Sequence, residues 1–493
     1  MTSTANLADA FDAQCRRAAD RSAVHDGAGR LSYGDLLRWS EAISATLASH
    51  VRPGQRVALA FPNSPAFVAG FFAAARVGGV VAPLNPGYRP PELLSHLGGL
   101  DPAAIVVDAS LLETLRDVAA RLARPPAIVE IGDPARIVLV DRGGGEASVA
   151  PTSGSPPLLQ LYTSGSTGAP KWVVRSHANL LAELAALRQA FALVPEDRFL
   201  GAAPFFHVNG LCRTVLASMY VGATLYPVRE FRRREILGLL TKERITFLGA
   251  VPQIFILLAE TPVREEVDLS ALRVAFSASA PLLPTSHRKF QEKYGVAIRQ
   301  LYGSTETGTI SVNLHPDPAS CPESVGTALE GVTVNVLDEG GHVLPPGQEG
   351  ELTITSPFAA FEYLGNPAAT VNAFRAGAYF SGDLGTKDAD GAIRITGRKK
   401  FLINRGGFKV NPYEVEAVIK EYPKVRDAVV FGTPGPHGDD LVCCYIVASE
   451  ECTTEEILLH CRDRIADFKV PSRIEFRPSL PTSSTGKILR AGL

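Results

Sequence analysis

The chain has 493 residues, more than one hydrophobic core usually organises, so two or three packed units are expected. Hydrophobic residues make up 46% of it and charged residues 20%, and the formal net charge is -2. This composition is that of a globular protein with no electrostatic bias toward polyanions, and it disfavours a nucleic-acid partner. The one arginine-rich stretch, at 229–235, is interrupted by glutamates.

The first residues are polar and lack the basic stretch and apolar core of a secretory signal, so we expect a cytoplasmic protein with no membrane partner. The most apolar stretch, 66–84, contains Arg76 and predicts a buried helix that leads into a strand. Seven cysteines form no C-x-x-C or similar metal-ligand pattern, which favours reduced thiols. We expect Cys443 and Cys444 to lie on the two faces of a buried strand.

Aliphatic runs alternate with amphipathic helical patterns along most of the chain. Leucines at helical spacing predict a helix over 180–191, and the alternation as a whole indicates an α/β architecture. The character changes from about 324 to 397, where strand-like segments at 332–337, 351–355 and 392–396 are separated by Gly, Pro and Asp. This part predicts a β-rich subdomain.

A distinct C-terminal unit follows. Asn411, Pro412 and Glu414 predict a helix N-cap, its first helical position and a capping-box partner. Strands are expected at 428–431, 441–447 and 473–476, with a helix beginning near Thr454. The pattern predicts a small α+β domain.

The chemistry begins at a loop rich in Ser, Thr and Gly that follows the apolar strand at 158–162 and ends in Pro170-Lys171. Glycine lets the backbone approach a ligand, hydroxyls and amides donate to phosphate oxygens, and lysine adds positive charge. It is not a Walker A loop, because the Gly486-Lys487 pair is followed by Ile488. A phosphate-binding loop and a plain surface turn both remain open here. The candidate residues are Thr163, Ser164, Gly165, Ser166, Thr167, Gly168 and Lys171.

Further motifs occur in a fixed order along nearly the whole chain: Pro204-Phe205-Phe206-His207, Tyr302-Gly303-Ser304-Thr305-Glu306, Ser381-Gly382-Asp383, Gly397-Arg398-Lys399-Lys400, Arg405-Gly406-Gly407-Phe408-Lys409 and Pro481-Thr482-Ser483-Ser484-Thr485-Gly486-Lys487. With them the chain resembles the superfamily of acyl-CoA synthetases, peptide-synthetase adenylation domains and luciferases. The resemblance implies an N-terminal domain at 1–398, made of two α/β subdomains and the β-rich part at about 324–397. It also implies a small mobile α+β domain at 399–493, with a hinge near Lys400.

The resemblance implies that the carboxylate of a small acid attacks the α-phosphate of ATP, and that the acyl group then passes to the thiol of CoA. Positioned positive groups would stabilise the developing charge. Lys487 resembles the lysine that bridges the acid and the α-phosphate, Thr305 is placed for that phosphate, and Glu306 matches the position that helps hold Mg²⁺. Rotation at Lys400 would withdraw Lys487 and bring the Gly407 loop to the thiol path.

The resemblance also assigns contacts to the nucleoside. Tyr302 resembles the residue that stacks on adenine, and Asp383 with Arg398 resembles the pair that binds the ribose hydroxyls. The implied nucleotide contacts further include Ala280, Gly303 and Ser304, and His207 joins the implied catalytic set.

The acid itself is less defined. The segment 205–209 lacks the aspartate that α-amino-acid-activating domains present, which disfavours an α-amino acid. The Ser-Ala-Ser-Ala-Pro loop at 277–281 replaces a commonly Gly-Gly-containing loop and hints at a short acid or a compact ring. Arg213 is either an acid-binding group or an ordinary helix-surface arginine. The candidate lining residues are His207, Val208, Arg213, Val251, Ala278 and Ser279.

Two residues depart from the family pattern. Trp172 stands where glycine is typical, which predicts either packing against a neighbouring strand or an altered phosphate loop. Phe401 stands where an acidic residue commonly follows the hinge. Three functions remain open: an acid:CoA ligase, an adenylating enzyme that loads a carrier protein or another acceptor, and a non-catalytic nucleotide-binding protein. The oligomeric state is open too.

Overall fold

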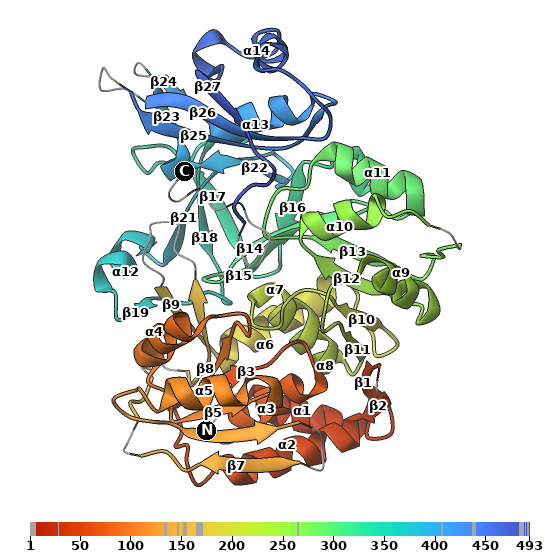
Figure 1. Cartoon of the computed structure of the whole chain (residues 1–493), viewed down its shortest axis with the longest axis vertical. Helices are drawn as coiled ribbons and strands as arrows, with labels where there is room; N and C mark the ends of the chain where they lie inside the picture. The colour runs from red at the N-terminus through yellow and green to blue at the C-terminus, as the bar shows by residue number, and fades with distance from the viewer. Residues whose placement is uncertain are drawn as a thin grey trace.

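The computed structural model describes residues 6–27, 29–132, 136–144, 147–150, 155–163, 171–263, 266–405, 408–435, 440–482, 488, 490 and 493. The first subdomain lies at one end of the molecule and the C-terminal unit at the other, with the β-rich part between them (Figure 1). Within the described part of the chain, no helix has the length and apolar character needed to cross a membrane.

The first subdomain is built on an eight-stranded sheet of order β19-β9-β8-β4-β3-β5-β6-β7. Its central strands pair in parallel and are buried on both faces, which accounts for their continuous aliphatic sequence. The strands are β3 (Arg56–Ala60), β4 (Val80–Leu84), β5 (Ala104–Val107), β6 (Ala127–Ile131), β7 (Ile137–Asp141), β8 (Pro157–Thr163), β9 (Lys171–Ser176) and β19 (Tyr363–Leu364).

Helices cover both faces of this sheet. Helices α4 (Pro90–Leu100) and α5 (Leu112–Ala119) pack on one face through Leu97 and Leu115. The other face meets the large core shared by α1 (Leu7–Arg17), α2 (Tyr33–Leu47), α3 (Pro65–Arg76), α6 (His177–Ala190) and α8 (Ala217–Val221). The predicted buried helix and strand at 66–84 are α3 and β4, and the predicted helix over 180–191 is α6.

A second sheet, of order β17-β18-β21-β22-β16-β15-β14-β13-β12-β10-β11-β1-β2 with β20 beside β21, joins the second α/β subdomain to the β-rich part. Helices α9 (Arg233–Lys242), α10 (Pro252–Ala259) and α11 (Pro284–Tyr294) cover one face of its parallel half. The parallel strands are β1 (Ser22–Asp26), β10 (Arg198–Gly201), β11 (Thr224–Pro227), β12 (Phe247–Ala250), β13 (Val274–Ser277) and β14 (Arg299–Ser304), and β2 (Gly29–Ser32) pairs antiparallel with β1 at the edge.

The segment predicted to be β-rich, about 324–397, lies in the antiparallel half of this sheet, which begins earlier, at β15. This half contains β15 (Gly308–Val312), β16 (Ser324–Ala328), β17 (Thr333–Leu337), β18 (Gly350–Thr355), β20 (Phe374–Arg375), β21 (Ala378–Lys387) and β22 (Ile393–Arg398), with the short helix α12 (Pro367–Ala373). The register of β21 and β22 sets Asp383 directly opposite Arg398.

The C-terminal unit has its own core, formed by residues such as Val415, Ile446 and Ile457. Asn411 caps α13 by accepting from the Tyr413 N–H, but the predicted capping box does not form, because Glu414 instead pairs with Lys469 at 2.6 Å. The elements are β23 (Ile403–Arg405), β24 (Phe408–Val410), α13 (Pro412–Lys420), β25 (Val425–Pro434), β26 (Asp440–Ala448), α14 (Thr454–Arg462) and β27 (Arg473–Phe476).

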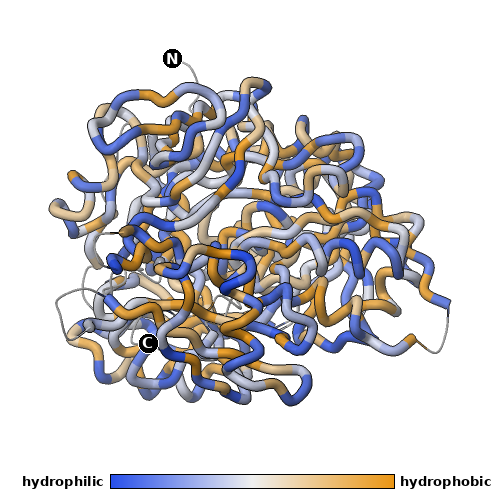
Figure 2. The backbone as a smooth tube through the Cα atoms, turned by 90° about the horizontal axis from the view of Figure 1, so that it is seen from above, coloured by the Kyte–Doolittle hydropathy of each residue, from blue (hydrophilic) through white to orange (hydrophobic). Residues whose placement is uncertain are grey.

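Hydropathy alternates over short distances along most of the chain, as expected for elements that bury one face (Figure 2). Cys443 and Cys444 are both buried in β26, as predicted. The mixed α/β class, with a large N-terminal domain and a small C-terminal domain, is confirmed.

Candidate active site

A cavity of about 990 Å³ lies where the two α/β subdomains, the β-rich part and the start of the C-terminal unit meet. Of the residues predicted from the sequence, those that line it are Thr163, Lys171, His207, Val208, Arg213, Val251, Ser279, Gly303, Ser304, Thr305, Glu306, Arg398 and Lys400. Ala278, Ala280, Tyr302 and Asp383 do not line it. Ser164, Gly165, Ser166, Thr167, Gly168, Gly407 and Lys487 lie outside the described residues.

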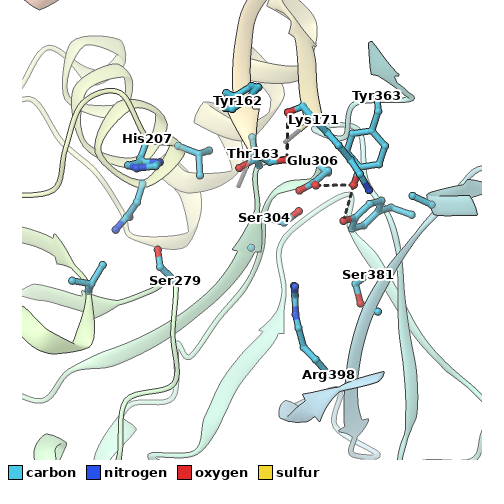
Figure 3. A pocket seen from close by; sticks show the side chains of 18 of the residues that line it. Tyr162, Thr163, Lys171, His207, Ser279, Ser304, Glu306, Tyr363, Ser381 and Arg398 are labelled. Atoms are coloured by element: carbon cyan, nitrogen blue, oxygen red, sulfur yellow. Dashed lines mark hydrogen bonds between the residues drawn. The ribbon is translucent and has the colours of Figure 1, made fainter. Parts of the chain in front are cut away.

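The two strands that flank the predicted phosphate loop converge on the cavity. Thr163, the last residue of β8, pairs with Lys171, the first of β9, and its hydroxyl donates to the Lys171 carbonyl at 3.3 Å. The Lys171 ammonium lies over the Tyr363 ring, 4.5 Å from its centre (Figure 3). The Lys171 ammonium is therefore held beside the cavity by an aromatic ring.

Trp172 packs in an aromatic cluster behind these strands. Its ring centre lies 4.5 Å from that of Tyr162 and 6.3 Å from that of His96, and His96 lies 4.1 Å from Tyr162. Trp172 also pairs with Leu364 of β19. These contacts support the interpretation that Trp172 packs against neighbouring elements.

Glu306 follows β14 and is 9% exposed, with its carboxylate on the cavity wall. The Tyr363 hydroxyl donates to Glu306 Oε1 at 2.7 Å and lies 3.4 Å from the Tyr379 hydroxyl (Figure 3). Burial, together with the Glu306 charge, raises the pKa of Tyr363, which keeps this phenol protonated and able to donate. Part of the carboxylate is thus held in place before any ligand arrives.

The predicted ribose pair forms a tight group beside the cavity. Arg398 Nε donates to Asp383 Oδ1, and the Tyr302 hydroxyl donates to Asp383 Oδ2 at 2.6 Å. Burial and the Asp383 carboxylate raise the pKa of Tyr302, so its hydroxyl also stays protonated. Burial alone would lower the pKa of Arg398, but the Asp383 carboxylate raises it. Arg398 points into the cavity toward Ser304 (Figure 3), whereas Asp383 orients it from behind.

The opposite wall carries the predicted acid-binding residues. His207 and Ser279 lie there, away from Glu306 and Tyr363 (Figure 3). Ser279 has φ of +76°, a left-handed conformation that costs a serine backbone energy and often occurs at functional sites. Arg213 lies on a π-helical segment, Leu211–Leu216, that directly follows the short helix α7 (Val208–Gly210). At 2% exposure, Arg213 is not the surface arginine of the alternative interpretation.

Lys400 lies in the short helical turn Lys399–Phe401 between β22 and the C-terminal unit. Burial lowers its pKa to about 8, and the nearby charges of Arg398 and Lys171 act in the same direction. The Lys400 ammonium also lies 4.4 Å from the centre of the Phe401 ring. The predicted hinge residue therefore contacts the cavity as well as the domain junction.

Several residues that line the cavity were not predicted from the sequence. Tyr363 reaches Glu306 across 57 positions, and no local pattern signals that contact. Asn209 also lines the cavity and was not predicted to do so, although it lies in the short helix that directly follows His207. The other missed residues include Tyr162, Phe231, Gln253, Ile254, Leu257, Asn366, Tyr379 and Ser381.

The fold is that of an adenylate-forming ligase. The chain belongs to the AMP-binding enzyme family: the model of that family matches residues 11–364, and the model of the AMP-binding enzyme C-terminal domain matches residues 414–487. Enzymes of this family use ATP and CoA, generally with Mg²⁺.

The relatives are CoA ligases. A feruloyl-CoA synthase from Streptomyces sp is 32% identical over 97% of this chain and 96% of its own length. An oxalate–CoA ligase from Arabidopsis thaliana is 32% identical over 96% of this chain and 94% of its own. Among solved structures, ATP-bound MatB from Rhodopseudomonas palustris is similar at a TM-score of 0.89 and 29% identity, covering 98% of this chain and 97% of that one. The chain is therefore an AMP-forming ligase of the acyl-CoA synthetase type.

Proposed function

We propose that this cavity activates a small carboxylic acid as its AMP anhydride and then passes the acyl group to the thiol of CoA. The observation that carries the proposal is that Lys171, Glu306 and Arg398 line one wall of a cavity whose other wall holds His207 and Ser279. A nucleotide on the first wall and an acid against the second would meet in the middle. Thr305 lines the cavity beside Glu306 and would contact the α-phosphate.

In the first step an oxygen of the acid carboxylate bonds to the α-phosphorus of ATP, and the bond from that phosphorus to the β-phosphate oxygen breaks, releasing pyrophosphate. Negative charge grows on phosphoryl oxygens, so preorganised cations are the main means of catalysis. Lys171 and Arg398 supply such charges from the described residues, and we assign Lys487 to the bridge between acid and α-phosphate. We also assign Tyr302 and Ala280 to the adenine surroundings and Asp383 with Arg398 to the ribose.

Glu306 fits the Mg²⁺ position. The described residues contain no cluster of three or more His, Cys, Asp or Glu side chains that could form a metal site on their own. A lone carboxylate that works with phosphate oxygens is, however, a usual way of holding Mg²⁺. When bound, the ion neutralises phosphate charge. The Tyr363 hydrogen bond would keep Glu306 turned toward the cavity.

In the second step the CoA sulfur bonds to the acyl carbon, the bond to the AMP oxygen breaks, and the thiol gives up its proton. We assign the change between the two steps to rotation of the unit at 399–493 about Lys400, which would exchange Lys487 for the Gly407 loop at the cavity. Burial and the nearby charges of Arg398 and Lys171 lower the pKa of Lys400, so its charged form is disfavoured in this pose, which supports such a role.

The test is mass spectrometry of reactions with ATP, Mg²⁺ and single acids, each run with and without CoA. We expect acyl-CoA and AMP when CoA is present, and acyl-AMP with pyrophosphate when it is absent. Transfer to a carrier protein alone would leave acyl-AMP unchanged by CoA and would contradict the second step. Formation of ADP in place of AMP would contradict the first.

A further inference from the structure

The acid-binding wall contains a buried guanidinium that the protein itself does not fully satisfy. Arg213 is 2% exposed and lines the cavity. Its Nε donates to Thr309 Oγ1 at 2.9 Å, but its buried Nη2 has no hydrogen-bond partner among the described residues. An unmet buried donor on a charged group is costly and is rare in folded proteins.

The charge around Arg213 is also incompletely balanced. Glu183 is the one carboxylate within electrostatic reach among the described residues, and it is already paired with Arg175 at 2.6 Å. Its other oxygen accepts from the Thr309 hydroxyl at 2.7 Å and from the Thr309 N–H at 2.8 Å. Burial raises the pKa of the neighbouring Cys212 thiol to about 12, so this group is neutral. Two guanidinium groups thus share one carboxylate, which leaves one net positive charge.

The Arg213 guanidinium lies at the wall of the reaction cavity. The Arg213 Nη2 atom lies so close to Gly303 that a Cβ at this position would overlap it, and Gly303 itself lines the cavity next to Ser304 and Thr305. The π-helical segment that carries Arg213 is a rare helix geometry, commonly found at functional sites. The side chain is therefore part of the wall that faces the reacting groups.

Asn209 adds a second unmet polar group to the same wall. It is 4% exposed and lines the cavity, and neither its Oδ1 nor its Nδ2 has a hydrogen-bond partner within the described part of the chain. Asn209 and Arg213 are four residues apart on continuous helix, so their side chains share a face. Val208, Val251 and Ile254 supply apolar surface nearby.

We propose that Arg213 and Asn209 form a subsite for a second carboxylate, so that the acid activated here is a short dicarboxylic acid. One carboxylate would react with ATP while the other accepts from the Arg213 guanidinium and from the Asn209 amide. A ligand carboxylate supplies both the acceptor and the negative charge that the wall lacks, and a guanidinium suits carboxylate geometry. This inference rests on the proposed acid activation and names its substrate class.

Wild-type protein provides the first test. Dicarboxylic acids of two to five carbons would be compared with monocarboxylic acids of equal carbon number, with acyl-CoA as the measured product. We expect kcat/KM for the best diacid to exceed that of its matched monoacid by about a hundredfold or more, because a site built around polar partners rejects a ligand that leaves them unpaired. Equal or better use of the monoacids would overturn the subsite while leaving acid activation intact. No product from any acid would instead contradict the proposed function.

Substitutions test whether Arg213 and Asn209 determine the preference for diacids over monoacids. Arg213→Met should lower kcat/KM for the diacid by about a hundredfold, mainly through KM, and change the monoacid value by less than about threefold. For Arg213→Lys, the diacid kcat/KM should lie between those of wild type and Arg213→Met, since lysine keeps the charge but loses the planar donor pair.

Asn209→Leu leaves the Glu183 pairing untouched and should also lower the ratio of diacid to monoacid kcat/KM. This variant keeps the test available if Arg213→Met does not fold. Arg188→Met, at an exposed position of α6 outside the cavity, is the matched control. An unchanged ratio in folded Arg213→Met or Asn209→Leu would contradict the subsite.

Discussion

The two walls of the cavity satisfy their polar groups in opposite ways. On the Glu306 wall, the Tyr363 hydroxyl donates to one oxygen of Glu306. Behind this wall, Tyr302 and Arg398 donate to the two oxygens of Asp383. On the facing wall, Arg213 and Asn209 keep buried polar atoms without partners among the described residues. The first wall is oriented by the protein, and the second is left to be completed by a ligand.

This difference matches the tasks proposed for the two walls. Stabilising charge that develops on phosphate requires groups that are already fixed, because reorganisation during the reaction would raise the barrier. Selecting an acid requires groups whose hydrogen bonds are completed only by the correct ligand.

Lys487→Ala should have the largest effect, lowering the rate of acyl-AMP formation at least about a hundredfold, as when one preorganised transition-state donor is removed. ATP–pyrophosphate exchange measures it. Transfer from supplied acyl-AMP to CoA should change little, because the assigned role is confined to the first step. Lys469→Ala, which removes a lysine of the same unit that pairs with Glu414, is the control. Normal exchange by Lys487→Ala would sink the assignment.

Asp383→Ala should raise KM for ATP about thirtyfold and leave KM for the acid nearly unchanged. Its loss would leave the Tyr302 hydroxyl and the Arg398 guanidinium without their acceptor, and would remove the assigned ribose contact. Steady-state kinetics with ATP varied provides the measurement. Asp388→Ala breaks a 2.7 Å pair between Arg394 of β22 and the residue that follows β21, outside the cavity, and is the control. Equal effects of the two substitutions would show that only sheet stability is involved.

Tyr363→Phe should raise the Mg²⁺ concentration needed for half-maximal adenylation about tenfold. One hydrogen bond to a charged group typically contributes about 1.5–3 kcal/mol, and part of it is recovered when the metal holds Glu306. Tyr422→Phe removes a tyrosine hydroxyl that lies 3.1 Å from Glu456 in the C-terminal unit and is the matched control. An unaltered Mg²⁺ dependence in Tyr363→Phe would show that Tyr363 does not contribute to Mg²⁺ binding at Glu306.

His177→Asn should reduce the acid sensitivity of the framework. His177 Nδ1 accepts from the Leu7 N–H at 3.1 Å, and burial lowers the pKa of His177 to about 4 from an ordinary 6.5. The unfolded chain therefore binds this proton first as pH falls, so the stability contributed by the neutral imidazole is present above pH 6.5 and declines toward pH 4. From pH 7.5 to 5.5 the loss is about 1 kcal/mol.

Asparagine keeps an acceptor near the Nδ1 position but does not titrate. Urea unfolding at both pH values should therefore show a drop in stability for His177→Asn that is smaller than the wild-type drop by about that amount. An equal drop in the two proteins would mean that His177 does not set the acid sensitivity.

Local patterns predicted the elements well, because burial and capping act over a few residues. The burial of Cys443 and Cys444 in one strand and the N-cap role of Asn411 were predicted from adjacent residues alone. The capping box at Glu414 was wrong because Lys469, distant in sequence, offered an ion pair that local reasoning cannot see.

Site residues in local motifs could be predicted from the sequence, whereas those that depend on distant contacts could not. Motif residues such as Thr163, Glu306 and Arg398 could be named from their sequence context, and they do line one cavity. Tyr363 could not, because its contact with Glu306 depends on β19 adding to the edge of a sheet formed much earlier in the chain. The burial of Arg213 was also inaccessible, since it depends on packing against Thr309 and Gly303.

The most direct test of the account is a two-stage reaction followed by mass spectrometry. The protein would first be incubated with ATP, Mg²⁺ and its acid in the absence of CoA, then depleted of ATP and given CoA. We expect acyl-AMP and pyrophosphate in the first stage and conversion of that acyl-AMP to acyl-CoA and AMP in the second. Acyl-CoA that forms only while ATP is present, with ADP as the nucleotide product, would contradict it.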